Sequence, residues 1–213
     1  MKTSFLKLVS KIEEMKEFWN ERYAQQEFIY GTEPNEFLRE ILTLLPIGRI
    51  ILPCDGEGRN AVFAAKLGWE VNAFDFSPSA KEKARVLAKQ EKVNPVFEVA
   101  DIVEKEFKEN SADVVALIYA HFPEGLRKIA HQKAIKWLKP GAKLVLEAFH
   151  PNQLENSSGG PKNIEMLYTE EMLRDDFKEL KIENLHSLET NLSEGEFHKG
   201  KADIVRLLAT KGD

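Results

Sequence analysis

The segment with the clearest chemical signature is a turn rich in small and polar residues, Cys54-Asp55-Gly56-Glu57-Gly58-Arg59-Asn60. Glycines at this spacing let the backbone pass close to a ligand, and a helix that starts there points free N–H groups at polar ligand atoms. The same spacing also suits a plain tight turn between a strand and a helix. Glycine spacing alone therefore leaves a nucleotide-like ligand and a purely structural turn about equally open.

Two aspartates further along the chain favour the ligand. Asp75 ends the next predicted strand, where a carboxylate can accept hydrogen bonds from both hydroxyls of a ribose. A helix cap is the alternative for Asp75, but Ser77, directly before Pro78, suits that task better. Asp101 follows a third predicted strand and could accept a hydrogen bond from an adenine amine, with simple solvation as its alternative. Three successive strand ends thus offer groups to one ligand.

His121 is the candidate for acid–base chemistry. It follows the fourth predicted strand, and a histidine has a pKa in the range that suits proton removal at neutral pH. Capping the next helix or packing under a lid is the alternative. His131 and His186 are interpreted as packing or surface residues. Four further residues are predicted to form the walls of a substrate pocket: Tyr30, Glu33, His150 and His198.

Composition limits the partners and the compartment. The 213 residues carry a formal net charge of −5, with a pI of about 5.7, which does not favour a nucleic-acid partner. Cys54 is the only cysteine, which excludes an internal disulfide and, with no closely spaced histidine pair, predicts no metal site. Without a recognisable secretion signal or an apolar run of membrane-spanning length, we expect a cytoplasmic protein with no membrane partner.

From Arg49 onward, short apolar runs alternate with amphipathic segments, which is the pattern of a parallel sheet wrapped by helices. The predicted strands are Arg49–Pro53, Glu70–Asp75, Pro95–Val99, Asp113–Tyr119 and Lys143–Phe149. The predicted helices between them are Asn60–Leu67, Pro78–Glu91 and Pro123–Leu138, the last stopped by Lys139-Pro140-Gly141.

The two ends of the chain depart from this alternation. Apolar spacing predicts an amphipathic helix over residues 1–20 and a second helix over Asn35–Leu45. After a loop and a short helix at Glu170–Phe177, Lys181–Leu192 and Lys201–Thr210 predict an antiparallel hairpin at the sheet edge. We expect one α/β domain over residues 1–213. Its core, residues 46–213, would be a Rossmann-like, doubly wound, seven-stranded mixed sheet closed by this C-terminal hairpin, and residues 1–45 would form a helical lid.

A dinucleotide-binding dehydrogenase would fit the turn nearly as well, because its fingerprint accepts alanine at the third position, here Ala61. The closing hairpin favours another class, since dehydrogenases usually lack it. From about Phe18 to Lys211, the chain resembles the class I S-adenosylmethionine-dependent methyltransferases. The pieces that carry the resemblance are Gly56-Glu57-Gly58-Arg59-Asn60, Val71-Asn72-Ala73-Phe74-Asp75, Ala100-Asp101, Asp113-Val114-Val115 and Trp137-Leu138-Lys139-Pro140-Gly141-Ala142.

Within that family the chain is similar to the bacterial tellurite-resistance and thiopurine methyltransferases, which act on small molecules. This narrower resemblance rests on Phe18-Trp19-Asn20-Glu21-Arg22-Tyr23, Tyr30-Gly31-Thr32-Glu33-Pro34-Asn35 and Gly159-Gly160-Pro161. It implies methyl transfer from S-adenosylmethionine to a small thiol, amine or oxyanion by in-line displacement, with no metal required. We expect a small-molecule acceptor as the partner, and a monomer or a homodimer.

The resemblance also implies roles for individual residues. Gly56 and Gly58 would border the methionine half of the cofactor, Asp75 would hold the ribose, and Asp101 with Ile102 would frame the adenine. His121 would take a proton from acceptors that must lose one. The full set predicted to contact S-adenosylmethionine is Cys54, Asp55, Gly56, Glu57, Gly58, Asn60, Asp75, Phe76, Ser77, Ala100, Asp101, Ile102 and Tyr119.

The end of the first strand departs from the family pattern. Members often carry an acidic residue at the place of Leu52 and a glycine at the place of Cys54. Leu52 cannot accept hydrogen bonds, so recognition of the methionine amino group would have to come from the backbone or from elsewhere. Pro53 also removes a hydrogen-bond donor from a central strand. These departures keep open a module that binds S-adenosylmethionine or S-adenosylhomocysteine without turnover, with an NAD(P)-binding oxidoreductase as a third hypothesis.

Overall fold

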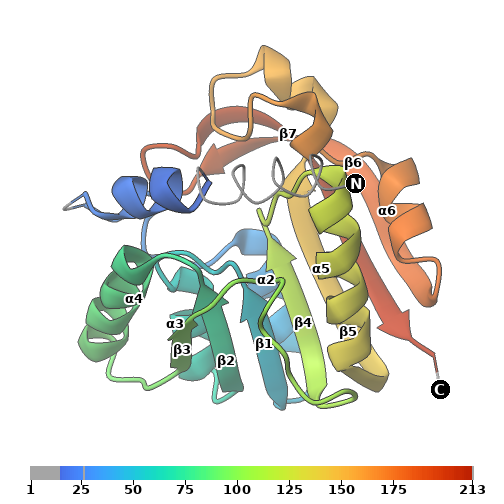
Figure 1. Ribbon diagram of the computed structural model, residues 1–213, viewed down its shortest axis with the longest axis horizontal. Helices are drawn as coiled ribbons and strands as arrows, with labels where there is room; N and C mark the ends of the chain where they lie inside the picture. The colour runs from blue at the N-terminus through green and yellow to red at the C-terminus, as the bar shows by residue number, and fades with distance from the viewer. Residues whose placement is uncertain (1–14, 26, 213) are drawn as a thin grey trace, which may run out of the picture.

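The centre of the molecule is one seven-stranded sheet, shown in Figure 1 for the computed structural model, which describes residues 15–25 and 27–212. Its strands are β1 (Arg49–Pro53), β2 (Glu70–Asp75), β3 (Val96–Val99), β4 (Ala112–Ile118), β5 (Leu138–Phe149), β6 (Leu180–Ser193) and β7 (Lys199–Lys211). Across the sheet they run in the order β3-β2-β1-β4-β5-β7-β6. β1 to β5 are parallel, and β7 lies antiparallel between β5 and β6. The predicted Rossmann-like mixed sheet with a C-terminal hairpin is confirmed.

Helices cover both faces of this sheet. They are α2 (Glu36–Leu44), α3 (Arg59–Lys66), α4 (Pro78–Gln90), α5 (Glu124–Trp137) and α6 (Glu170–Asp176), with short 3-10 helices η1 (Pro151–Glu155) and η2 (Ile164–Met166) after β5. Apolar residues of α2 and α3 pack on one face, and those of α5 and α6 pack on the other. No helix in the described ranges is both long and apolar enough to cross a membrane.

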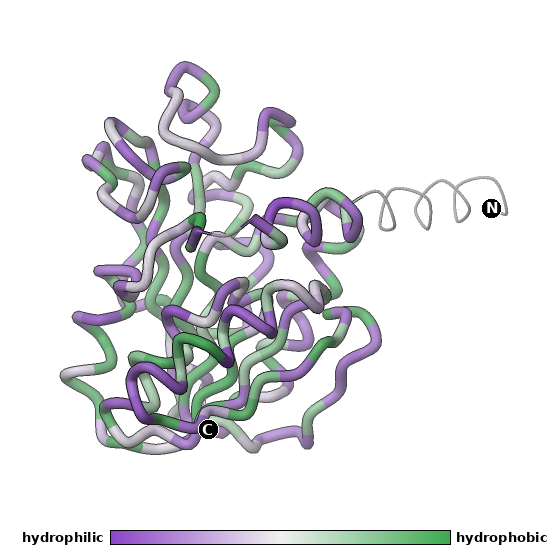
Figure 2. Tube along the Cα trace, turned by 90° about the vertical axis from the view of Figure 1, so that its left-hand side faces the viewer, coloured by the Kyte–Doolittle hydropathy of each residue, from purple (hydrophilic) through white to green (hydrophobic). Residues whose placement is uncertain are grey.

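The core follows from the alternation of side chains along the central strands. Ile50 and Leu52 of β1 pack with α2 and α3, whereas Ile51 between them packs in the cluster that contains α5. Because both faces are covered, a central parallel strand must be apolar on both sides. Figure 2 shows the result as hydrophobic stretches along the strands in the middle of the molecule, with hydrophilic residues on the surrounding turns.

Most element boundaries lie one or two residues from the sequence prediction, and three of the differences have a clear physical reason. β3 begins at Val96 and not at Pro95, which has no N–H to donate. β4 ends at Ile118, because Tyr119 has a φ of 51° and leaves the strand conformation. β5 begins at Leu138 and not at Lys143, because α5 ends one residue earlier and Leu138 already pairs with Ala112 of β4.

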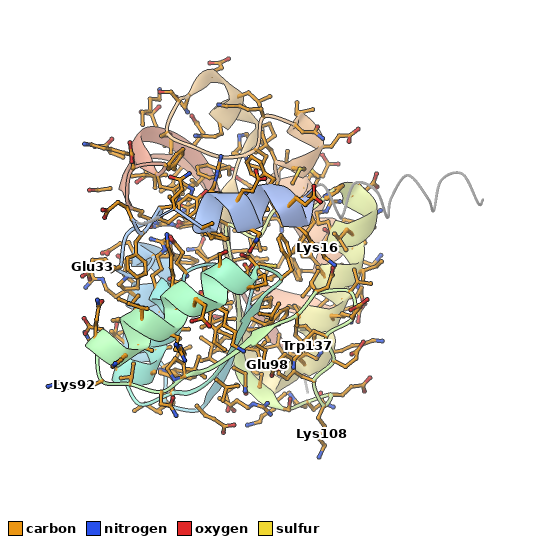
Figure 3. The ribbon with its side chains drawn as sticks, turned by 60° about the vertical axis from the view of Figure 1, so that its left-hand side comes forward. Lys16, Glu33, Lys92, Glu98, Lys108 and Trp137 are labelled. Carbon is orange, nitrogen blue, oxygen red and sulfur yellow. The ribbon has the colours of Figure 1, made fainter. Side chains whose placement is uncertain are left out.

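The N-terminal segment lies over the carboxyl ends of the strands. Residues 15–23 are helical, and Figure 3 shows them above α4; the part of the predicted first helix over residues 1–14 lies outside the described residues. Asn20 holds the segment to the start of α4, since its Oδ1 accepts hydrogen bonds from Ser77 Oγ (2.8 Å) and Ser79 N (3.2 Å). The second predicted helix is α2, which starts after Asn35 because the Asn35 side chain caps it by accepting from Leu38 N.

Candidate functional site

A cavity of about 720 Å³ opens at the carboxyl ends of β1, β2, β4 and β5. This is the edge at which open α/β sheets bind ligands, and the volume suits a nucleotide-sized molecule with a small second ligand. Residues of the N-terminal segment form one side of it: Met15, Phe18, Trp19, Arg22, Tyr23 and Tyr30. The predicted site residues that line it are Tyr30, Cys54, Asp55, Gly56, Glu57, Asn60, Asp75, Phe76, Tyr119, His121 and His198.

The glycine-rich turn is closed by Asp55. Its carboxylate accepts hydrogen bonds from Asn60 Nδ2 (3.1 Å) and Ala61 N (3.1 Å), so it fastens the turn to the first residues of α3. Burial raises the pKa of Asp55 to about 7 against the lowering effect of these bonds. Gly58 has a φ of 84°, and a Cβ there would lie 2.5 Å from Ala84 Cβ on α4. Only glycine therefore lets α3 and α4 approach at this point.

Asp75 is joined directly to this turn. One carboxylate oxygen accepts from Gly56 N (3.1 Å) and the other from Ser77 N (2.9 Å). Burial raises the pKa of Asp75 to about 6, partly offset by these backbone bonds. Each oxygen keeps capacity for a further hydrogen bond. The helix cap falls to Ser77, whose Oγ accepts from Ala80 N, which leaves Asp75 available for a ligand.

The residues predicted to frame an adenine do not line the cavity. Asp101 Oδ1 accepts from Val103 N (2.9 Å), and its Oδ2 pairs with Lys16 of the N-terminal segment at 2.8 Å. Ile102 is buried in the core cluster that contains α5, with Ala100 packed against it. Gly58 and Ser77 do not line the cavity either. Asp101 therefore meets the N-terminal segment in this structure, and its contact with adenine stays a prediction.

His121 lines the cavity, but the backbone engages both of its ring nitrogens. Nδ1 lies 2.6 Å from the Met166 carbonyl oxygen, so Nδ1 carries the proton, and Nε2 accepts from Phe149 N (3.2 Å). Burial lowers the pKa of His121 to about 4. The side chain thus connects the ends of β4 and β5 to η2. This arrangement agrees with the alternative of a structural role for His121. Its role as a base stays a prediction, and one of these bonds would have to open first.

This arrangement makes His121 a source of acid sensitivity. Because its pKa is depressed in the folded state, its stabilisation is present above about pH 6.5 and is lost as the pH falls toward 4, by up to about 3 kcal/mol. His121→Asn keeps an N–H donor for Met166 and does not titrate. We expect the difference in unfolding free energy between wild type and variant, from urea titrations, to shrink from about pH 7.5 to about pH 4.5. A constant difference would contradict the neutral, buried state.

The four predicted pocket walls divide equally. Tyr30 and His198 line the cavity, whereas Glu33 and His150 do not. Glu33 is exposed, and Figure 3 shows its side chain at the outer surface of the molecule. His150 caps η1, with its Nδ1 accepting from Asn152 N (3.3 Å). Because its ring takes part in the local hydrogen bond that starts η1, His150 does not reach the pocket wall that its position after β5 had suggested.

The cavity wall beyond β4 is aromatic. The ring centroids of Tyr30 and His198 are 4.4 Å apart, those of Tyr119 and His198 are 4.6 Å apart, and those of Tyr119 and Phe149 are 4.8 Å apart. These residues come from the N-terminal loop, from the ends of β4 and β5, and from the turn between β6 and β7. Together they offer an apolar, water-excluding surface to a small ligand.

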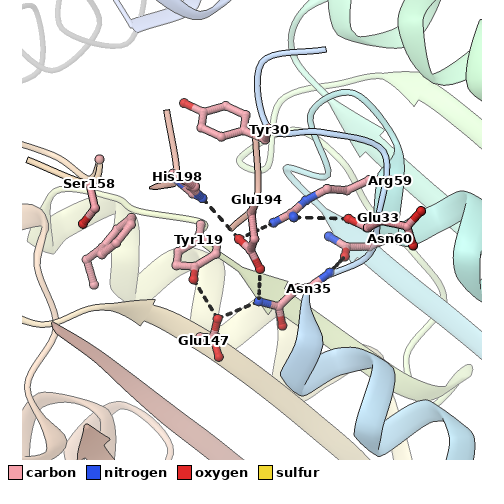
Figure 4. Close-up of polar contacts among 12 residues, drawn as sticks. Tyr30, Glu33, Asn35, Arg59, Asn60, Tyr119, Glu147, Ser158, Glu194 and His198 are labelled. Atoms are coloured by element: carbon pink, nitrogen blue, oxygen red, sulfur yellow. Dashed lines mark hydrogen bonds and ion pairs between the residues drawn. The ribbon is translucent and has the colours of Figure 1, made fainter. Parts of the chain in front are cut away.

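Behind this wall lies a buried polar network that the sequence did not suggest. Glu147 on β5 is 1% exposed and accepts from Arg206 Nε (2.6 Å), Asn35 Nδ2 (2.6 Å) and Tyr119 Oη (2.8 Å). Figure 4 shows Asn35 bridging Glu147 and Glu194. Glu194 also binds Arg59 Nη2 (2.9 Å). The network thereby joins the N-terminal segment, α3, the sheet and the C-terminal hairpin.

Glu57, a predicted cofactor residue, is occupied in holding the N-terminal loop. Its Oε2 accepts from Tyr30 N (3.2 Å), and its Oε1 accepts from Lys83 Nζ of α4 (2.7 Å). Lys83 also donates to the carbonyl oxygen of Glu27. Because Glu57 is only 3% exposed, this ion pair is largely shielded from solvent. The glycine-rich turn, the N-terminal loop and α4 are therefore fixed together at one point.

The fold and the place of the cavity define a class: Rossmann-like α/β proteins with a ligand site at the carboxyl edge of a mixed sheet. Residues 53–141 match the family model of a methyltransferase domain. That stretch contains the glycine-rich turn, Asp75 and His121. The core of the site therefore lies in the part of the chain that matches this family model. No curated protein sequence matches the chain.

Solved structures share this fold over most of the chain. A protein studied for the conversion of a disulfide bond into a thioacetal group in echinomycin biosynthesis is 19% identical, with a TM-score of 0.74 over 93% of this chain and 92% of its own. TehB from Haemophilus influenzae is 15% identical, with a TM-score of 0.66 over 92% of this chain and 66% of its own. Magnesium protoporphyrin IX methyltransferase from Synechocystis, solved with bound S-adenosylhomocysteine, is 16% identical, with a TM-score of 0.64 over 82% of this chain and 81% of its own. At these identities the likeness establishes the fold.

Proposed function

We propose that the protein is an S-adenosylmethionine-dependent methyltransferase that acts on a small molecule. The observation that carries this proposal is the buried Asp75 carboxylate, which is bonded to Gly56 N, lines the cavity and belongs to the stretch that matches a methyltransferase-domain model. A structural neighbour that binds S-adenosylhomocysteine at 16% identity supports the same cofactor. When bound, the cofactor supplies an electrophilic methyl group on a sulfonium sulfur.

The residues present fit this cofactor. Asp75 has hydrogen-bonding capacity left for ribose hydroxyls, and Gly56 keeps the turn low, since a Cβ there would lie 2.7 Å from Tyr23 Oη. The fold accommodates both departures from the family pattern. Leu52 is buried in the core and does not line the cavity, and Cys54 adopts a φ of 55° that glycine more often takes. For Cys54 this conformation costs about 1 kcal/mol.

The chain contributes alignment and exclusion of water. In-line displacement at a methyl group needs a nucleophile held in position in a dry pocket more than it needs a charged helper. Trp19 and Tyr23 stack at a centroid distance of 5.5 Å over one side of the cavity. The aromatic wall of Tyr30, Tyr119 and Phe149 forms another. The space between them is where we place the acceptor.

Asp75→Asn tests the cofactor site. We expect it to weaken S-adenosylhomocysteine binding at least tenfold in titration calorimetry, because charge-assisted hydrogen bonds contribute about 1.5–3 kcal/mol each. Asp113→Asn is the matched control, since Asp113 lies at the start of β4 and binds Arg49 N and Lys139 Nζ. Equal affinities for the two variants would contradict the ribose role, and binding of NAD in place of S-adenosylhomocysteine would revive the dehydrogenase hypothesis.

The acceptor is proposed to be a small thiol, amine or oxyanion, and nucleic acid is disfavoured by the net charge of −5. The tellurite-resistance and thiopurine branch remains a proposal, supported by the sequence motifs and by the shared fold of TehB. The second hypothesis is a module that binds the cofactor without turnover. Formation of S-adenosylhomocysteine from S-adenosylmethionine with any small acceptor would exclude that module. A cytoplasmic monomer or homodimer remains our expectation.

A further inference from the structure

We propose that His198 is the general base of this site, and that the methyl acceptor is therefore a small molecule whose nucleophilic nitrogen, oxygen or sulfur carries a proton. This inference rests on the proposed methyltransferase function and names the substrate class for it. His198 belongs to the turn between β6 and β7, is 5% exposed and lines the cavity. The sequence suggested this residue as a pocket wall only.

The hydrogen bonds of His198 differ from those of His121 in the way that a base requires. Its Nδ1 lies 3.3 Å from Glu194 Oε2, and a carboxylate can only accept, so Nδ1 carries the proton. Nε2 then carries the free lone pair. Within residues 15–25 and 27–212, no hydrogen bond engages Nε2 of His198, whereas both nitrogens of His121 are bonded to backbone.

Glu194 is itself held in place, as an orienting carboxylate must be. Arg59 Nη2 donates to Oε2 (2.9 Å), and Asn35 Nδ2 donates to Oε1 (3.1 Å), as Figure 4 shows. Burial alone would raise the pKa of Glu194, but the hydrogen bonds from His198 and Arg59 and the Arg59 charge outweigh it, and the pKa is lowered to about 2. Glu194 therefore stays ionised and fixes which His198 nitrogen carries the proton.

The surroundings keep His198 neutral and ready to accept a proton. Burial lowers its pKa, the Glu194 charge raises it, and the charges of Arg59 on α3 and Arg22 in the N-terminal segment lower it again. His121 at the end of β4 is the other titratable imidazole near it, and the phenols of Tyr30 and Tyr119 pack on its ring. The net direction is downward, so the imidazole is unprotonated at neutral pH.

The proposed step balances without a further reactant. A bond forms between the acceptor's heteroatom and the methyl carbon, while the methyl–sulfur bond breaks and leaves its electron pair on the sulfur. The acceptor's proton passes to Nε2 of His198 and then to solvent. The rings of Tyr30, Tyr119 and Phe149 around His198 suit a flat or apolar acceptor.

The competing explanation is that His198 has only a structural role and stabilises the hairpin turn through its hydrogen bond to Glu194. His198→Asn separates the two roles, because the Asn amide can donate to Glu194 from the place of Nδ1 but offers no lone pair at the place of Nε2. His186→Asn is the matched control. His186 lies on β6 of the same hairpin and also bonds a side chain through Nδ1, that of Asn184 (2.8 Å).

Nuclear magnetic resonance of the ¹⁵N-labelled full chain with S-adenosylhomocysteine tests the geometry without an acceptor. We expect His198 to be the Nδ1–H tautomer with an unbonded Nε2, and to titrate below the ordinary histidine range. Glu194→Gln should lower that pKa further, because a raising charge is removed. The opposite tautomer, or an Nε2 signal that matches the bonded Nε2 of His121, would overturn the proposal.

Turnover tests the base role with phenol, aniline and benzyl thiol as acceptors, each of which keeps its proton at neutral pH. For any of them that is methylated, His198→Asn should lower kcat about a hundredfold or more with little change in KM, and His186→Asn should not. Transfer by His198→Asn at the wild-type rate would overturn the proposal. If none is methylated, the NMR result decides. If the wild type does not bind S-adenosylhomocysteine, the proposed function itself is overturned.

Discussion

Replacing Arg206 with methionine should lower the free energy of unfolding by roughly 3–5 kcal/mol, because it leaves the Glu147 carboxylate buried without its counter-charge. Glu147 and Arg206 face each other across β5 and β7, at a distance of 2.6 Å between Oε2 and Nε. The side chain of Glu147 is 1% exposed and that of Arg206 is 18% exposed. The Arg206 guanidinium also lies over the Phe37 ring, with Cζ 4.9 Å from the centroid, and methionine removes this cation–π contact together with the charge.

The double variant Arg206→Met, Glu147→Gln isolates the cause. Glutamine still offers one oxygen to Asn35 and Tyr119 but carries no charge, so it should restore most of the lost stability. Arg39→Met on α2 is the surface control, since its ion pair with Glu36 is about half exposed and should contribute little to the free energy of unfolding. Urea titrations at neutral pH measure all four proteins. A loss in Arg206→Met no larger than in Arg39→Met would show that Glu147 does not depend on Arg206.

The order of the fold was predictable because it depends on local signals. Alternating apolar runs and helix stops placed the strands within a few residues, and Ser77 before Pro78 marked the start of α4 correctly. The glycine-rich turn and Asp75 also come together as expected, since parallel strands bring their carboxyl ends to one edge. What failed locally was Tyr119, because a positive φ in a non-glycine residue has no sequence signal.

The rest of the site depends on contacts between distant parts of the chain. Asn35 and Glu147 are 112 residues apart, and Asn35 and Glu194 are 159 residues apart. Nothing in the spacing of these residues predicts that they meet, because the register of the hairpin on β5 decides it. The motif Tyr30 to Asn35, noticed only as a family likeness, was the one available signal. The sequence also could not show which of His121 and His198 is the better candidate for a general base. Whether Nε2 has a free lone pair depends on which backbone groups reach each ring.

These long-range contacts give the N-terminal segment its place beside the cavity. Tyr30 N binds Glu57, Arg22 Nη1 donates to Tyr30 Oη (3.0 Å), and Asn20 binds the start of α4. Gly31 and Gly195 complete the attachment, because the backbone of the N-terminal loop packs on the turn between β6 and β7. The N-terminal segment and the hairpin thus meet through backbone as well as through side chains such as those of Tyr30 and His198.

Replacing Gly195 with alanine should therefore separate the N-terminal loop from the hairpin. A Cβ at this position would lie 2.5 Å from Gly31 N and 2.5 Å from the Ile29 carbonyl oxygen, and Gly195 has a φ of 79°. Backbone strain and overpacking together should lower the free energy of unfolding by roughly 2–5 kcal/mol. Tyr30 and His198 lie next to this backbone contact between the N-terminal loop and the hairpin, so S-adenosylhomocysteine affinity should fall as well. Amide hydrogen exchange of residues 27–31 should become faster.

Gly200→Ala is the control that isolates the contact, since Gly200 lies in β7 of the same hairpin. It has a φ of 104°, so alanine is strained there too, but its Cβ would meet no atom within 4 Å. Gly200→Ala should therefore show only the cost of backbone strain, about 1–2 kcal/mol, with wild-type exchange in residues 27–31 and wild-type cofactor affinity. If the two variants show the same hydrogen exchange and the same cofactor affinity, the contact between Gly195 and Gly31 does not hold the N-terminal loop. Loss of S-adenosylhomocysteine binding in Gly195→Ala alone would show that the hairpin keeps the N-terminal segment in place beside the cavity.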